Sequence, residues 1–200
     1  MRIIAGSARG RHLSGPGSRV GTSIRPTADR AREALFNILG WEFFTNALVL
    51  DLFAGTGALG LEALSRGAKA AVFVDNSLLA LELLHKNIVA CGFSDKAHVV
   101  RHDLLKSLFF WHKSSLEPSG LDGRHSPSFD LVFLDPPYRQ GRCAELLTAL
   151  LAAELVSKDT QIIFEDDSAE HLPESLGELQ LTDQRRYGDT GFWFYEKGTV

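Results

Sequence analysis

The residues best suited to chemistry lie near the middle of the chain, where an apolar run ends in a carboxylate, two prolines and an aromatic ring. The run 129–134 predicts a buried strand, and the two prolines end it abruptly. The Asp135 carboxylate and the Pro136 carbonyl can accept both N–H groups of an exocyclic amine and hold its lone pair toward a methyl donor, while Tyr138 stacks on the ring. The alternative is a tight Asp-Pro turn after a core strand. The candidate catalytic residues are Asp135, Pro136, Pro137 and Tyr138.

A second candidate site is a glycine-rich loop that follows an earlier strand. Gly55, Gly57 and Gly60 have the spacing of the dinucleotide fingerprint, and Asp75 ends the next strand, where an acid would hold two ribose hydroxyls. This spacing does not separate NAD from S-adenosylmethionine. Asp51 favours S-adenosylmethionine, because a carboxylate beside the loop repels a pyrophosphate but suits a ligand that carries an ammonium and a sulfonium.

Acids at three successive strand ends can each bind a different part of this donor. We expect Asp51 at the amino-acid end, Asp75 at the ribose and Asp103 at the adenine amine, although each could be only a helix N-cap, Asp103 above all. Phe53 either lines the donor pocket or belongs to the core. The candidate donor-binding residues from this pattern are Asp51, Phe53, Gly55, Gly57, Asp75, Asn76, Asp103 and Leu104. No metal is expected, because neither the seven histidines nor the two cysteines have metal-type spacing.

The charge of the chain is unevenly distributed. The net charge is −4, yet residues 1–32 contain seven arginines, one acid and no lysine, which gives this segment +6 and the remainder −10. A basic arm on an acidic body predicts phosphate contacts, and arginine favours bidentate ones. The alternatives are a solvated basic tail or a strand needed only for folding. The candidate RNA-contacting arginines are Arg2, Arg9 and Arg11 in the arm, Arg25, and Arg139 and Arg142 after the strand-end motif.

Length and composition indicate one domain with a small appendage: 200 residues, of which 44% are hydrophobic. No apolar stretch approaches the ~18 residues of a membrane span. The first residues lack a signal-peptide core, so we expect a cytoplasmic location. The two cysteines, Cys91 and Cys143, are expected to be ordinary packing residues in a reducing compartment.

The order of the elements favours a mostly parallel sheet covered on both faces, with ligands beyond the carboxyl ends of its strands. Residues 2–13 have hairpin character, and a helix is expected over 29–40. Residues 113–128 predict a mobile loop at the sheet edge opposite the site. Predicted strands are 47–52, 70–75, 97–101, 129–134 and 161–165, with a closing antiparallel hairpin of 179–187 and 192–196. Predicted helices are 58–66, 77–90, 104–112 and 141–155.

Four blocks of the sequence resemble one known family. RPTADRAREALFN (25–37), LDLFAGTGALGLEALSRGA (50–68), FDLVFLDPPY (129–138) and RRYGDT (185–190) are similar to the RsmD family of 16S ribosomal RNA guanine-N2 methyltransferases. Asp75 stands where these relatives often carry glutamate, which keeps the carboxylate. The resemblance covers nearly the whole chain.

The resemblance implies a class I S-adenosylmethionine-dependent methyltransferase fold, Rossmann-like and seven-stranded, over residues 25–200, with a basic N-terminal hairpin arm over 1–24. It implies S-adenosylmethionine as donor. The expected target is a guanine of small-subunit ribosomal RNA within a ribosomal assembly particle. By position, Arg25 and Thr27 match the segment that closes over the donor in related enzymes, so Thr27 joins the donor-binding set.

Other functions stay open at this point. The strand-end motif fits adenine N6 or cytosine N4 equally well, so an amino-methyltransferase acting on another RNA or on DNA is the first alternative. A catalytically silent RNA-binding assembly factor is the second, and a nicotinamide dehydrogenase is the third. For the methyltransferase we expect direct displacement, in which proximity and preorganised acceptors do most of the work.

Overall fold

The computed structural model describes residues 1–15, 26–106, 128–137 and 141–198, and for residues 26–28 it describes the helical backbone alone. The predicted loop 113–128 therefore lies almost wholly outside the described residues. The helical elements are α1 (Pro26–Leu39), the 3-10 turn η1 (Glu42–Phe44), α2 (Ala58–Ser65), α3 (Leu78–Cys91) and α4 (Cys143–Ala152). The strands are β1 (Leu48–Leu52), β2 (Ala70–Asp75), β3 (Ala97–Arg101), β4 (Phe129–Leu134), β5 (Val156–Asp167), β6 (Ser175–Leu176), β7 (Leu179–Tyr187) and β8 (Thr190–Lys197).

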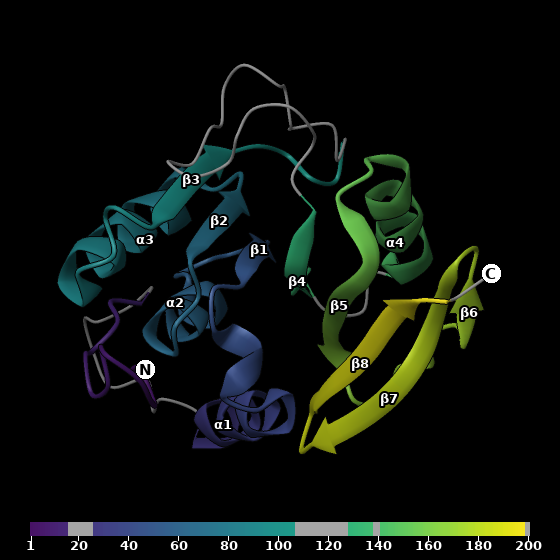
Figure 1. Cartoon of the computed structure of the whole chain (residues 1–200), viewed down its shortest axis with the longest axis horizontal. Helices are drawn as coiled ribbons and strands as arrows, with labels where there is room; N and C mark the ends of the chain where they lie inside the picture. Colours follow the sequence, from purple (N-terminus) through teal and green to yellow (C-terminus); the bar gives the residue numbers. More distant parts are fainter. Residues whose placement is uncertain (16–25, 107–127, 138–140, 199–200) are drawn as a thin grey trace.

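All eight described strands form one sheet in the order β3-β2-β1-β4-β5-β8-β7-β6 (Figure 1). Neighbours from β3 to β5 are parallel, and β8 is antiparallel to both β5 and β7. The chain moves from β1 outward to β2 and β3, then returns to place β4 on the other side of β1. Ligands bind beyond the carboxyl ends of the strands at such a switch point, here between β1 and β4.

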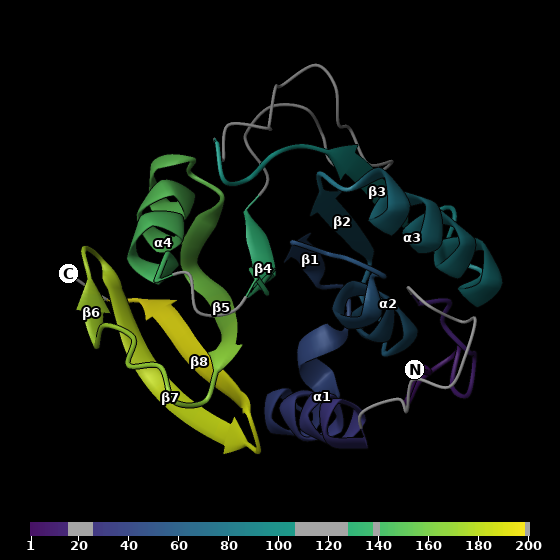
Figure 2. The ribbon, with the colours of Figure 1, turned by 180° about the vertical axis from the view of Figure 1, so that it is seen from behind.

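The central strands are buried on both faces, which is why they read as continuous apolar runs. Alternate residues belong to two separate cores. Val49 and Leu131 pack in the core that includes α1, α2 and α3, whereas Leu50 and Val132 pack in the core that includes α4. The two views of the molecule show α4 on its own beside β4 and β5 (Figures 1 and 2).

Several element boundaries differ from those expected. The first helix begins at Pro26 instead of Asp29. Strand β5 spans 156–167 instead of 161–165, because Val156 pairs with Phe129 of β4 and residues 162–167 pair with β8. The two-residue strand β6 was not predicted, so the described sheet has eight strands instead of seven. Residues 104–106 form a turn, and the rest of the helix predicted over 104–112 lies outside the described residues.

The N-terminal segment forms the expected hairpin and is docked on the core. Arg2 and His12 form an antiparallel bridge, and the Ile3 and Gly10 amides donate to carbonyls across it. Ile3, Ala8 and Leu13 are buried among residues of α1, α2 and α3. A solvated tail is therefore excluded for residues 1–15. The predicted boundary between residues 24 and 25 lies outside the described residues.

A buried glutamate fixes the hairpin to α2. The Glu62 carboxylate, with no exposed surface, accepts the amides of Ile4 (2.7 Å) and Ala5 (3.0 Å) and pairs with Arg66 at 2.9 Å. Each of these bonds has a charged partner, which makes it stronger than a neutral one. At Gly6 (φ +83°) a Cβ would lie 1.8 Å from the Ser65 carbonyl oxygen, so the turn of the hairpin touches the end of α2 directly. The hairpin is thus a rigid part of the domain surface.

Candidate active site

The carboxyl ends of β1, β2 and β4 meet around an open pocket of about 540 Å³. This pocket brings together the strand-end motif and part of the predicted donor site. It is lined by Phe53, Asp75, Asn76, Ser77, Asp135, Pro136 and Pro137. The juxtaposition follows from the strand order, because β1 lies between β2 and β4.

The glycine loop between β1 and α2 is held by two carboxylates. The Gly60 amide donates to Asp51 Oδ2 and the Gly55 amide donates to Asp75 Oδ2, both at 2.9 Å. Phe53 (φ 62°) has left-handed backbone geometry, which is rare and costly for an aromatic residue and is found mostly at functional sites. At Gly60 a Cβ would lie 2.3 Å from the Phe73 ring, so this position needs glycine for close packing of helix on sheet.

Asp75 faces the pocket with hydrogen-bonding capacity to spare. Its Oδ1 accepts the Ser77 amide at 2.8 Å and its Oδ2 accepts the Gly55 amide. Each carboxylate oxygen has about two acceptor sites, so both oxygens can still accept a hydroxyl. The side chain is half-buried, and its orientation is fixed before any ligand arrives.

Three carboxylates lie near the carboxyl ends of β1 and β4: Asp51, which is buried, and Asp135 and Glu165, which are half-buried. Burial raises the pKa of Asp51 from 3.8 to about 7. The hydrogen bond from the Gly60 amide opposes this rise, and the charges of Asp75 and Glu165 add to it. Burial raises the pKa of Asp135 well above its usual value, and the carboxylates of Glu165 and Asp51 add to this. A cluster of this kind favours a cationic ligand and disfavours a pyrophosphate. The arrangement therefore does not suit NAD.

A second pocket, of about 180 Å³, lies on the other side of Asp135, which lines both. It is lined by Met1, Ala31, Arg32, Ala58, Leu59, Asp135, Glu165, Thr190 and Phe192. The Arg32 guanidinium is buried, donates from Nη2 to the Arg2 carbonyl (2.6 Å) and to Asp29 Oδ1 (3.1 Å), and has no partner at Nε within the described structure. Burial lowers the pKa of Arg32.

Arg32 and Glu165 were not singled out from the sequence. An acid at the carboxyl end of a fifth parallel strand is a signal that could have found Glu165, by analogy with Asp135. Arg32 lies three residues after Asp29 on a predicted helix, a spacing that indicates a surface ion pair more readily than a pocket residue. Its burial depends on the hairpin, which no local pattern reveals.

Other predicted site residues lie apart from the pocket or outside the described residues. The Asp103 carboxylate accepts the Leu105 amide (3.2 Å) and pairs with Lys106 (3.2 Å), as the N-cap alternative expects. Its side chain also bonds that of Asn76, which lines the pocket, and Leu104 is buried. The Arg142 guanidinium donates to Glu145 and to the Leu105 carbonyl. Arg25, Tyr138 and Arg139 lie outside the described residues, as does the Thr27 side chain.

Within the described ranges, no group of three or more histidine, cysteine, aspartate or glutamate residues could hold a metal ion. A search of the same residues finds no helix long and apolar enough to cross a membrane. Cys91 and Cys143 are both buried as free thiols.

The family model described as Conserved hypothetical protein 95 matches residues 1–196. The chain belongs to this family. It is 32% identical to ribosomal RNA small subunit methyltransferase D of Escherichia coli (strain K12), over 98% of this chain and 90% of that protein. It is 37% identical to YlbH of Bacillus subtilis (strain 168), which is named provisionally as an rRNA methyltransferase, over 98% of this chain and 99% of that protein.

A solved structure of another relative has the same fold. Escherichia coli yhhF, titled provisionally a methyltransferase, matches with a TM-score of 0.77 and 30% identity over 100% of this chain and 99% of that chain. The resemblance drawn from the four sequence blocks is confirmed, and so is the predicted fold of a mostly parallel sheet with a C-terminal antiparallel hairpin.

Proposed function

We propose that the protein transfers the methyl group of S-adenosylmethionine to the exocyclic N2 amine of a guanine in small-subunit ribosomal RNA. The observation that carries this proposal is the place of Asp135, half-buried at the start of the Asp-Pro-Pro sequence and shared by two adjoining pockets. A donor and an acceptor can therefore meet at one carboxylate. The family membership and the ribosomal RNA methyltransferase names of the relatives supply the substrate class.

The larger pocket suits the adenosine part of the donor. Asp75 has free acceptor sites for the ribose hydroxyls, and Phe53 and Pro136 give the pocket apolar surface. We assign the adenine amine to Asp103, which lies beside the pocket through its bond to Asn76. Gly55 and Gly57, both with positive φ, keep the loop backbone close to the ligand.

The smaller pocket suits the amino-acid part of the donor. Arg32 is the one residue among its lining that carries a permanent positive charge, which suits a carboxylate in this space. Glu165 lines the same space and supplies the negative charge that an ammonium requires, which leaves Asp135 for the acceptor amine. We therefore revise the expected role of Asp51. Its carboxylate is buried and bonded to Gly60, so it acts by shaping the loop and by adding negative potential.

When bound, S-adenosylmethionine would supply an electrophilic methyl group: the amine nitrogen would attack the methyl carbon, and the S–CH3 bond would break to leave the neutral thioether S-adenosylhomocysteine. Asp135 and the Pro136 carbonyl accept the two N–H groups and so direct the lone pair, an orientation effect that needs no strong base. A cation beside Asp135 keeps its carboxylate ionised. After transfer the positive charge is on the amine, and the raised pKa of Asp135 suits it to take the proton that the methylated amine releases. Tyr138 is proposed to stack on the guanine, and Thr27 to close over the donor.

We further propose that the substrate is a ribosomal assembly particle in the cytoplasm, because the relatives are named for ribosomal RNA. An enzyme acting on another RNA or on DNA, and a silent assembly factor, remain the competing functions. Small ribosomal subunits from a strain that lacks this gene, naked ribosomal RNA and duplex DNA are the three substrates to compare, with transfer of a labelled methyl group as the readout. Mass mapping should locate the product as N2-methylguanine.

Asp135→Ala should bind S-adenosylmethionine with little change by calorimetry and lose at least 100-fold in the single-turnover rate, since a preorganised acceptor is removed. Asp95→Ala removes a carboxylate from an exposed position and serves as the matched control. A rate for Asp135→Ala within about threefold of wild type would take Asp135 out of the mechanism.

A further inference from the structure

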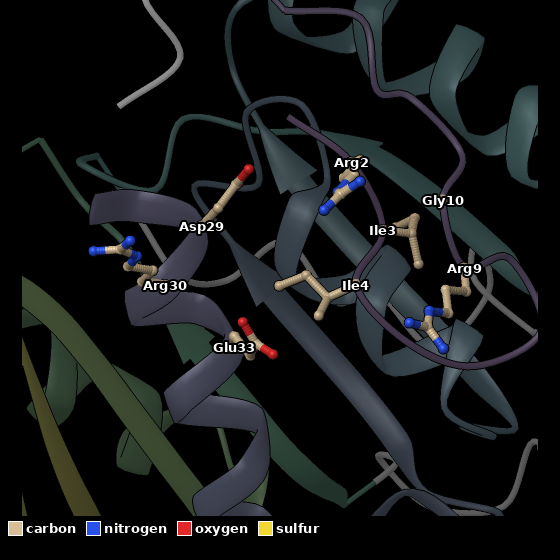
Figure 3. A pocket seen from close by; sticks show the side chains of 8 residues that line it. All are labelled: Arg2, Ile3, Ile4, Arg9, Gly10, Asp29, Arg30 and Glu33. Atoms are coloured by element: carbon tan, nitrogen blue, oxygen red, sulfur yellow. The ribbon is translucent and has the colours of Figure 1, made fainter. Parts of the chain in front are cut away.

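A third pocket lies between the N-terminal hairpin and α1, outside the two pockets that meet at Asp135 (Figure 3). It has a volume of about 300 Å³, within the range of small-ligand sites. It is lined by Arg2, Ile3, Ile4, Arg9, Gly10, Asp29, Arg30 and Glu33, and among the described residues it shares none of these with the other two pockets.

The pocket is lined by arginines whose positive charges are not neutralised by ion pairs within the described structure. The side chains of Arg2, Arg9 and Arg30 are exposed, and none has an ion-pair or hydrogen-bond partner among the described residues. Arg2 and Arg9 come from the hairpin, and Figure 3 shows both reaching from it toward α1. Figure 3 shows the Arg30 side chain directed away from the hairpin, so the free guanidinium groups of Arg2 and Arg9 are the ones suited to bidentate binding of a phosphate.

The other side of the pocket carries features that a phosphate site alone would not need. Glu33 is exposed on α1, and Figure 3 shows its carboxylate turned toward Ile4. Among the ion pairs of the described residues, Glu33 pairs with neither Arg2 nor Arg9, so all three side chains can contact a ligand. A carboxylate accepts the N–H groups of a base, and Ile4 offers an apolar surface to the ring. The lining thus fits a phosphate and a base together.

The third pocket is linked to the active site through Arg32. Asp29 lines the pocket and accepts from Arg32 at 3.1 Å, and Arg32 also donates to the Arg2 carbonyl. Arg32 in turn lines the pocket that contains Asp135. The consecutive residues Met1 and Arg2 also connect the two pockets: Met1 lines the pocket that contains Asp135, and Arg2 lines the third pocket. A strand of RNA with its guanine at Asp135 therefore has its neighbouring nucleotides close to this space.

We propose that this pocket binds one unpaired nucleotide that flanks the methylated guanine, with Arg2 and Arg9 on its phosphate and Glu33 on the amine of its base. The inference rests on the proposed function, because it takes RNA as the substrate. A guanine fits Glu33 best, since its N1–H and N2–H groups can donate side by side to one carboxylate. Because the hairpin is fixed to α2 through Glu62, the pocket is preformed and selects the local shape of the RNA.

Two variants with opposite charge effects test the pocket on small ribosomal subunits that lack the modification. Arg9→Ala should raise the KM for subunits about tenfold and flatten the slope of log KM against log salt by about 0.7–0.9, the value for one phosphate contact. Glu33→Gln should also raise this KM about tenfold, because one of two acceptors for the base is lost. The affinity for S-adenosylmethionine should not change in either variant.

The matched controls are Lys158→Ala and Glu82→Gln, which remove the same charges at exposed positions on β5 and α3. If Glu33→Gln lowers the KM, the carboxylate only repels phosphate, and the nucleotide assignment is overturned. If both pocket variants match their controls while the wild-type enzyme methylates the subunits, the inference fails and the proposed function stands. A wild-type enzyme that is inactive on every RNA overturns both.

Discussion

Asp51 offers the sharpest physical test of the site, because its buried charge should make the protein less stable as the pH rises. Burial raises the pKa of Asp51 from 3.8 to about 7. Between these values the folded protein binds more protons than the unfolded chain, so the free energy of unfolding falls with increasing pH. The cost to the folded state reaches about 4 kcal/mol above pH 7, and about 2.5 kcal/mol of it develops between pH 5 and pH 8.

Asp51→Asn removes this charge and keeps an oxygen that can accept the Gly60 amide. We expect the variant to be more stable than wild type at pH 8 by up to ~4 kcal/mol, and the advantage to shrink by about 2.5 kcal/mol at pH 5. Urea unfolding at the two pH values measures the difference. Activity should fall even though stability rises, because the negative potential at the donor site is reduced.

The matched control is Asp95→Asn, which removes an exposed carboxylate and should change the free energy of unfolding by less than ~0.5 kcal/mol at both pH values. If the advantage of Asp51→Asn is the same at pH 5 and pH 8, the carboxylate does not titrate in a buried site, and the electrostatic argument is wrong.

Three further predictions concern the donor site and the hairpin. Asp75→Ala should weaken S-adenosylmethionine by roughly 1–3 kcal/mol, since charge-assisted bonds to the ribose are lost, and an unchanged dissociation constant by calorimetry would place the ribose elsewhere. Gly60→Ala should cost about 1–3 kcal/mol of stability through overpacking against Phe73, so an unchanged melting temperature would contradict the close helix–sheet contact. Glu62→Gln should cost about 1–3 kcal/mol and speed hydrogen exchange at the Ile4 and Ala5 amides, and protection equal to wild type would show that another contact docks the hairpin.

The sequence by itself determined the parallel half of the fold and the position, at a strand end, of the motif proposed as catalytic. The strands over 70–75, 97–101 and 129–134 have the predicted bounds. For 70–75 and 129–134 the reason is that a strand buried on both faces is mostly apolar and is ended by glycine, proline or an acid. Asp75 and Asp135 were found for the same reason. A polar residue directly after such a strand stands at its carboxyl end, and parallel strands bring these ends to one edge.

Only the tertiary structure decided which further groups reach that edge. The local pattern of the hairpin shows basic residues and glycines, and its docking depends on Glu62 and Ser65, which lie more than fifty residues away in the chain. The same docking buries Arg32 beside Asp135 and forms the pocket that Arg2 shares with Glu33. The raised pKa values of Asp51 and Asp135 also depend on tertiary packing, first through burial and then through the proximity of other carboxylates. Sequence periodicity reports contacts within an element, whereas these features require elements distant in sequence to pack together.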